Sequence, residues 1–537
     1  MTLKQIAALG RKLITFLKMF SDCFGRREAR VLFKVYTQGQ LSDLSRKNAE
    51  AIALKFGKAP RTLQRFLESI KWDGEKLQGR CQQIIAQEHS HAEAIGTIDE
   101  SGVPKSGKET VGVARQWCGH EGKVDNCVVG VHLGYAAPGF RCLISSALYL
   151  PEDWANDPER RKKAYVPEDV KFRTKQQIAL GLIDQALANG VRVGAWTFDE
   201  FYGRDGKFLD GLEQRGQAFV AEVPKNFRGW VIKPEVSTSG LQNRRGRPKQ
   251  YPRLVRRKPG YEVQNLLRYS PALRTQSWQR YRIKDTNKGP EVWEIKWSEF
   301  WRKEATGLPG RQQTLIVARN VLTGEVKYFL SNRVPGKNGI TLRWLLRVAF
   351  GRWSVECCFR EAKEELGLDH YQVRGWQSVH RHFYLTQLSH LFCARIRQEY
   401  DPHQAEFLPA PIPEPAPSTT TSRKLGSKPA KPTCPSTLGN DLQLNLLGPL
   451  TIEQVRSAMN IWLEAACMTP AARQQHYEKE LKKQRYHQRR NAQARQSHTK
   501  TRLTKLSELG IDVGRIKSCI PKPQQDILHF CAQSGKT

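Results

Sequence analysis

The chain has 537 residues, which suffices for roughly three or four structural units and a sizeable apolar core. Its 87 Lys plus Arg residues exceed its 52 Asp plus Glu residues, giving a formal net charge of +35 that favours a polyanionic partner, with nucleic acid expected first. No stretch reaches the ~18 apolar residues of a bilayer span, so we expect no membrane partner and a cytoplasmic location.

Residues 1–90 are predicted to form a helical N-terminal DNA-binding domain. Within it, a short helix, a Gly-containing turn and a second helix opening at Pro60 have the spacing of a helix-turn-helix reader. An ordinary helical hairpin with a solvated basic face fits the same spacing. In the first interpretation the second helix contacts DNA through the polar residues of one face, Arg61, Gln64 and Arg65.

From residue 91 the apolar pattern changes to period two. Residues 91–225 show consecutive strand-like segments, then strands that alternate with helix-like segments. This order predicts a mixed α/β core rather than a doubly wound sheet. Two of its strands, ending at Asp99 and Asp199, are apolar until the acid, so each carboxylate is expected where a mixed sheet opens to a ligand.

Residues 226–330 break the alternation and are rich in Trp and β-branched residues, which predicts a strand-rich insertion. A segment of this insertion resembles the arginine hook that enters A·T-rich minor grooves. A solvated loop is the competing interpretation. The hook would contact DNA through Arg244, Arg245 and Arg247.

Residues 331–400 are predicted to be the second part of the core, with one long helical stretch over 339–368 and an amphipathic helix over 381–400. Residues 401–440 are rich in Pro, Ser and Thr and predict a linker. Residues 441–537 are predicted to be helical and basic, with eleven Lys or Arg against two Glu between Arg473 and Lys505. Such a run is either a solvated tail or a segment that follows a phosphate backbone, and the net charge of this chain favours the second.

A helix-borne acid, Glu356, completes a set of three with Asp99 and Asp199. Carboxylate oxygens suit hard divalent cations, and two Mg²⁺ ions, with Mn²⁺ as a substitute, catalyse in-line phosphodiester displacement. At helical spacing Arg352 and Lys363 share a face with Glu356, where they are suited to hold DNA phosphates.

Neighbouring acids offer alternatives at each position. Glu100 and Glu200 adjoin the two aspartates, but successive strand residues point to opposite faces, so only one of each pair is expected at the metal. On the helix, the alternatives without suitably spaced cations are Glu361, Glu364 and Glu365.

These residues resemble the RNase H-like DDE transposases of bacterial insertion sequences. One branch has the signature Tyr, two residues, Arg, three residues, Glu, six residues, Lys; Arg352, Glu356 and Lys363 match it, and Ala349 stands at the Tyr position. Blocks such as IDESGVPKSGKETVGVARQWCG and KEELGLDHYQVRGWQSVHRH resemble one subgroup, the insertion sequence seven-hundred-and-one family.

The resemblance implies an RNase H-like core with a strand-rich insertion, flanked by helical segments. It also implies a nucleoid-associated bacterial transposase that binds terminal inverted repeats, cleaves DNA and joins the freed 3′ end to target DNA as a homodimer in a synaptic complex. Two alternatives stay open: an RNase H-like nuclease that cuts without joining, and a DNA-binding protein that has lost catalysis.

Overall fold

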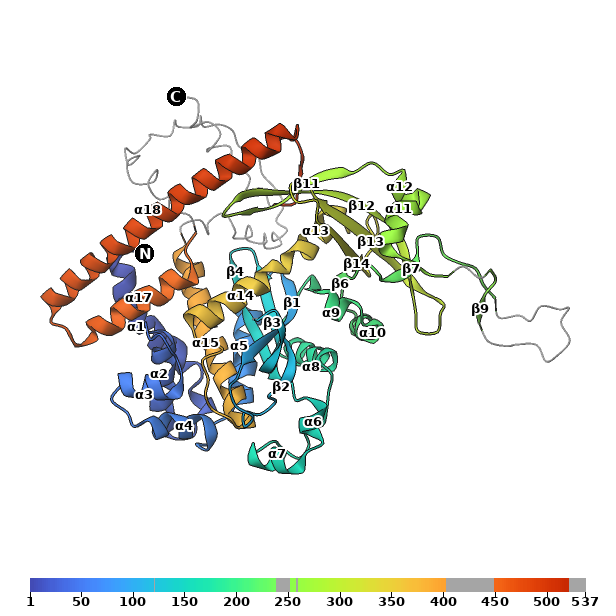
Figure 1. Ribbon diagram of the computed structural model, residues 1–537. Coiled ribbons are helices and arrows are strands. Elements are labelled where there is room, and N and C mark those ends of the chain that lie inside the picture. Colours follow the sequence, from blue (N-terminus) through green and yellow to red (C-terminus); the bar gives the residue numbers. More distant parts are fainter. Residues whose placement is uncertain (120, 238–251, 257–258, 402–448, 521–537) are drawn as a thin grey trace, which may run out of the picture.

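The computed structural model describes residues 1–119, 121–237, 252–256, 259–401 and 449–520 (Figure 1). The predicted linker at 401–440 lies outside the described residues, apart from Asp401, and so do Arg244, Arg245 and Arg247. None of the helices that are described is both long enough and apolar enough to cross a bilayer.

The first 88 residues are helical, with buried apolar faces that pack together and against the core. Thr2, Asn48 and Asp73 cap three of these helices through side-chain oxygens, which accept hydrogen bonds from first-turn amides. The elements are α1 (Leu3–Lys18), the short 3-10 turn Ser21–Cys23, α2 (Arg27–Gln40), α3 (Ala49–Lys55), α4 (Pro60–Glu68) and α5 (Gly74–Glu88).

The core sheet has the strand order β4-β3-β1-β5-β6. Strand β3 is antiparallel to β1 and β4, whereas β1, β5 and β6 are parallel to one another. This arrangement confirms the predicted mixed α/β, RNase H-like fold class. The strands are β1 (Ile95–Pro104), β2 (Ala114–Cys118), β3 (Lys123–Ala137), β4 (Phe140–Leu148), β5 (Ala195–Phe198) and β6 (Phe219–Val223).

Helices cover both faces of this sheet. On one face Phe198 of β5 packs against Phe208 of α10, with ring centroids 5.1 Å apart. On the other face α14 lies over β1 and β3. The helices between the core strands are α6 (Glu152–Ala155), α7 (Pro158–Lys163), α8 (Lys175–Ala188), α9 (Glu200–Gly203) and α10 (Gly206–Gln214).

Most strands of the segment after β6 join the core sheet, whereas β8 and β9 pair with each other in a separate two-stranded sheet. Strand β14 pairs antiparallel with β6, and β13 and β12 continue outward, so that the described residues form one 13-stranded sheet (Figure 1). The elements are β7 (Arg228–Trp230), β8 (Val236–Ser237), β9 (Arg253–Leu254), β10 (Tyr261–Glu262), α11 (Val263–Tyr269), α12 (Pro271–Arg274), β11 (Gln279–Thr286), β12 (Gly289–Lys303), β13 (Pro309–Asn320) and β14 (Val326–Ser331).

The predicted long helical stretch is divided into three pieces. Helix α13 (Leu342–Gly351) ends at Arg352, α14 (Trp353–Arg360) begins there, and a π-helical turn (Glu361–Glu365) follows. A single α-helix over these residues is therefore wrong. The π turn changes the spacing after Arg360, and such turns occur frequently at functional sites.

Helix α15 (Trp376–Tyr400) runs through the middle of the molecule, where it contacts the N-terminal helices and β4 (Figure 1). The prediction of an amphipathic helix is wrong here, because its polar residues are largely buried and bonded to distant partners. The C-terminal elements are α17 (Ile452–Glu464), the 3-10 turn Ala465–Cys467, α18 (Pro470–Glu508) and β15 (Lys517–Ser518).

Candidate active site

The two predicted aspartates lie side by side on neighbouring parallel strands. Ile98 of β1 is level with Phe198 of β5, so the next residues, Asp99 and Asp199, follow at one level. Asp99 does not end its strand as predicted, because the long antiparallel strand β3 keeps β1 extended to Pro104. It lies where the parallel pairing with β5 stops, so its side chain still reaches the end of β5.

Local backbone contacts orient both aspartates. The Asp199 side chain caps α9, accepting hydrogen bonds from the amides of Phe201 at 3.1 Å and Tyr202 at 3.4 Å. One oxygen of Asp99, Oδ1, accepts the Glu100 amide at 2.8 Å. The second oxygen of Asp99 faces the neighbouring helix.

Glu356 is linked to Asp99 through Arg352. The Arg352 guanidinium lies 2.9 Å from Glu356 Oε1 and 3.5 Å from Asp99 Oδ2, although Arg352 and Asp99 are 253 positions apart. The Glu356 side chain is half exposed, whereas that of Asp99 is largely covered. Arg352 therefore occupies a position between carboxylates from a strand and a helix.

The electrostatics of the site favour an added cation. Burial, and next the charge of Asp199, raise the pKa of Asp99 to about 7. Burial also raises the pKa of Asp199, against two backbone hydrogen bonds that lower it. For Arg352 burial acts to lower the pKa, but the charges of Asp99 and Glu356 outweigh it and raise the pKa.

Lys363 lies in the π-helical turn beyond Glu356. Burial lowers its pKa, while the charge of Asp369, and more weakly that of Asp99, acts in the opposite direction. The negative charge of Asp99 therefore acts on the ammonium group of Lys363.

The neighbours of the two aspartates have other surroundings. Glu100 points to the opposite face of the sheet from Asp99, where Lys175 Nζ at the start of α8 lies 2.8 Å from its Oε2. Glu200 is exposed as the first residue of α9. The structure thus separates each aspartate from the acid beside it.

The predicted DNA-contacting residues of α4 lie on its outer side, while Leu63, Phe66 and Leu67 face the core. Arg61 is exposed but forms an ion pair with Glu68 at 2.8 Å. Gln64 is partly buried and Arg65 is exposed.

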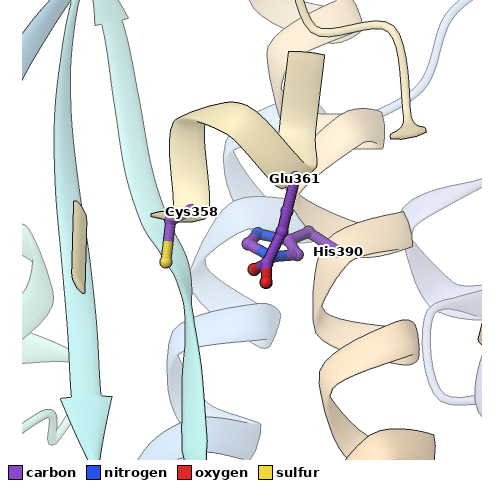
Figure 2. A group of neighbouring side chains, drawn as sticks. All are labelled: Cys358, Glu361 and His390. Atoms are coloured by element: carbon purple, nitrogen blue, oxygen red, sulfur yellow. The ribbon is translucent and has the colours of Figure 1, made fainter. Parts of the chain in front are cut away.

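A second group of potential metal ligands lies behind α14. Single ligand atoms of Cys358, Glu361 and His390 all lie within 4.8 Å of one another, and all three residues are buried (Figure 2). Arg141 forms an ion pair with Glu361, and a guanidinium nitrogen of Arg397 lies 3.9 Å from it.

The chemistry of this group is that of an ion-pair cluster rather than a metal centre. His390 Nδ1 accepts the Leu143 amide at 3.3 Å, which leaves Nε2 to carry the proton toward Glu361 Oε2 at 3.3 Å. Burial raises the pKa of the Cys358 thiol and keeps it protonated. Two guanidinium groups would also repel a cation, so the cluster anchors α14 against β4 and α15.

Sequence reasoning does not identify Glu222, which the structure ties to the site through Arg352. It offers Glu361 only as an alternative that lacks suitably spaced cations on its own helix, whereas the partners of Glu361 come from β4 and α15. Glu222 is a lone acid in an apolar strand, a signal of the same kind as that of Asp99.

The three carboxylates suit a divalent cation by the chemistry of their oxygens, although in the described residues their ligand atoms do not all lie within the 4.8 Å that joins Cys358, Glu361 and His390. Asp99, Asp199 and Glu356 offer the hard oxygen ligands that Mg²⁺ prefers, and a cation would relieve the repulsion that raises the pKa of Asp99. In the described structure, Arg352 supplies the compensating positive charge.

An RNase H-like sheet that carries acids at one level of adjacent parallel strands is typical of a class of nucleic-acid-cutting enzymes. The family model described as DDE superfamily endonuclease matches residues 19–290, which are 272 of the 537 residues, and the chain therefore belongs to this family. Membership implies a general dependence on divalent metal. The match includes Asp99 and Asp199 and ends before Glu356.

The chain is also similar to a more specific protein, described as a probable transposase for insertion sequence element IS701, from Microchaete diplosiphon. The two are 30% identical over 196 residues, which are 36% of this chain and 49% of the relative. The match thus spans about half of the relative's length. Both comparisons confirm the predicted family resemblance.

Proposed function

We propose that this protein is a DNA transposase that binds the terminal inverted repeats of an insertion sequence, cleaves a phosphodiester bond at each end and transfers the freed 3′-hydroxyl into target DNA. The observation that carries the proposal is the grouping of Asp99, Asp199 and Glu356 around Arg352. The name of the IS701 relative supports the choice of transposition over other DDE chemistry.

In this proposal Asp99, Asp199 and Glu356 hold two Mg²⁺ ions, with Mn²⁺ as a substitute. When bound, such a pair activates a water or a 3′-hydroxyl and neutralises charge on the departing oxygen. The amides of Phe201 and Tyr202 fix the Asp199 carboxylate, so it needs little reorientation to bind a cation.

The cationic residues would position DNA. Arg352 can exchange its carboxylate partners for a phosphate, because a guanidinium donates equally well to either. Lys363 adds a second positive charge within the same field. Both ends of an element must be cut together, so we propose a homodimer in a synaptic complex.

The proposal assigns a role to each of the six predicted segments of the chain. Residues 1–90 and 441–537 would contact DNA on either side of a core at 91–225 and 331–400, into which 226–330 is inserted. The linker at 401–440 would join the core to the C-terminal segment.

The test is a cleavage assay on DNA that carries the repeats flanking the gene. With Mg²⁺, nicks should map to the repeat termini, and joined products should follow when target DNA is added. Asp99→Asn should abolish both while leaving DNA binding nearly intact. Glu364→Gln, an exposed acid near Glu356, is the matched control.

Other outcomes select the alternatives. Nicks at random positions would favour a nuclease that does not join DNA. Binding without nicks in the wild-type protein would favour a DNA-binding protein that has lost catalysis. Unchanged cleavage by Asp99→Asn would remove Asp99 from the site.

A further inference from the structure

A fourth carboxylate lies level with the two aspartates. Strand β6 follows β5 in the sheet, and Phe198 pairs with Ala221, so Glu222 is level with Asp199. Since Ile98 pairs with Phe198, the parallel strands β1, β5 and β6 present an acid at the same level. Side chains at equivalent positions of adjacent strands share a face, so Glu222 lies on the face of the sheet that carries Asp99.

Both oxygens of Glu222 face cations. Oε1 accepts a hydrogen bond from Lys327 Nζ at 2.8 Å, and Oε2 lies 3.6 Å from Arg352 Nε. Lys327 belongs to β14, the neighbouring antiparallel strand. The Glu222 side chain is 13% exposed, so solvent screens these contacts only partly. A carboxylate engaged on both sides by protein cations is better suited to hold Arg352 than to bind a metal.

Arg352 is held from three directions. Its Nε faces Glu222, while its two terminal nitrogens face Asp99 and Glu356. A guanidinium is planar and rigid, so a contact at Nε fixes where the other two nitrogens point. Without Glu222, the carboxylates of Asp99 and Glu356, and more weakly that of Asp199, would attract the group, and it would move deeper into the space between Asp99 and Glu356.

We propose that Glu222 is a positioning residue that draws Arg352 toward β6 and so limits how far its guanidinium enters the space between Asp99 and Glu356, where a divalent cation would bind. The proposal rests on the proposed function, since that function makes Asp99 and Glu356 metal ligands. Lys327 holds Glu222 in place, so the insertion contributes to the site through one side chain.

The test is a Mn²⁺ titration of the full-length protein without DNA, in which electron paramagnetic resonance measures free Mn²⁺. Glu222→Gln should weaken Mn²⁺ affinity about tenfold, the scale on which groups that support metal ligands act. Glu222→Asp, which keeps the charge but is one methylene shorter, should give a smaller loss. Glu325→Gln is the control, because Glu325 also contacts Lys327, at 3.7 Å, but is not paired with Arg352.

The double variant separates positioning from ligation. Arg352→Ala should bind Mn²⁺ at least as tightly as wild type, and Glu222→Gln should change affinity less than about twofold in that background. The same tenfold loss in both backgrounds would overturn the proposal, because Glu222 would then be a ligand itself. Unchanged affinity in Glu222→Gln alone would also overturn it.

Asp99→Asn distinguishes a failure of the positioning role of Glu222 from a failure of the proposed metal site. If it abolishes Mn²⁺ binding while Glu222→Gln has no effect, the positioning role fails and the metal site of the proposed function stands. If Asp99→Asn leaves Mn²⁺ binding unchanged, the proposed metal site fails, and the role of Glu222 fails with it.

Discussion

Replacing Glu361 by Gln tests whether the ion pairs of Glu361 with Arg141, His390 and Arg397 hold α14, the helix that carries Glu356, in place. Burial acts to raise the pKa of Glu361, but the hydrogen bond with His390 and the charges of Arg141 and Arg397 outweigh it and lower the pKa from 4.5 to about 2. That difference corresponds to about 3 kcal/mol of stabilisation by the ionised carboxylate. The Glu361 side chain is 9% exposed, so solvent screening reduces this figure little.

Glu361→Gln should therefore lower the free energy of unfolding by about 3 kcal/mol near pH 7, because the amide leaves the buried Arg397 and the partly buried Arg141 without the charge of Glu361. Urea titration followed by circular dichroism measures the loss. Hydrogen exchange in α15 and in the π-helical turn after α14 should rise with it, since the turn carries Glu361 and α15 carries two of its partners. Glu364→Gln, at an exposed position three residues away, should change stability by less than about 0.5 kcal/mol.

The pH dependence provides a second check. A carboxylate with a lowered pKa stabilises the folded state above its ordinary pKa of 4.5, and this contribution is lost as the pH falls toward 2. The difference between wild type and Glu361→Gln should shrink over that range. A variant with wild-type stability at pH 7 would refute the idea that the cluster anchors α14.

Three further predictions concern the site and the DNA-binding surfaces. In metal-free protein, Asp99→Asn should raise the free energy of unfolding at pH 8 by up to about 4 kcal/mol. An acid whose pKa is raised from 3.8 to about 7 destabilises the folded state as the pH rises through that range. Urea titrations at pH 8 and pH 4 should therefore show the gain only at pH 8. Arg65→Ala should weaken DNA binding more than Arg61→Ala, because Arg61 is already paired with Glu68; equal losses in a fluorescence anisotropy titration would contradict this. Truncation after Asp401 should flatten the salt dependence of DNA affinity by roughly one unit of slope per lost phosphate contact, and an unchanged slope would show that the C-terminal segment makes no phosphate contacts.

The sequence allowed prediction of the fold class and of the two aspartates because both depend on local patterns. Strands that are apolar until an acid indicate Asp99 and Asp199, and the two-residue period of a strand separates each from the glutamate that follows it. Glu222 shows the same pattern, but no signature adjoins it in the sequence. The proposed role of Glu222 depends on two features: the register of β5 with β6, which brings it level with Asp199, and its contact with Arg352. Neither feature can be read from a period-two pattern.

Burial of polar residues was the main feature that local patterns missed. The helix over 381–400 was predicted to be amphipathic, yet its polar residues His390 and Arg397 are buried, and Glu361 compensates them from another helix. Strand β1 was expected to stop at Asp99, but pairing with β3 extends it. In each case the deciding partner is distant in sequence.

The length of helix α18 can be compared with the length of a DNA duplex that would lie along it. Its 39 residues span about 58 Å, which equals the rise of about 17 base pairs of duplex DNA. Its first turns lie near α1 and α17, and its last turns pack on β12, a strand of the sheet that also holds the carboxylates (Figure 1). Because both ends of α18 are held by other elements, the distance between them is fixed. A duplex that lay along α18 would therefore reach the 13-stranded sheet about 17 base pairs from the N-terminal helices.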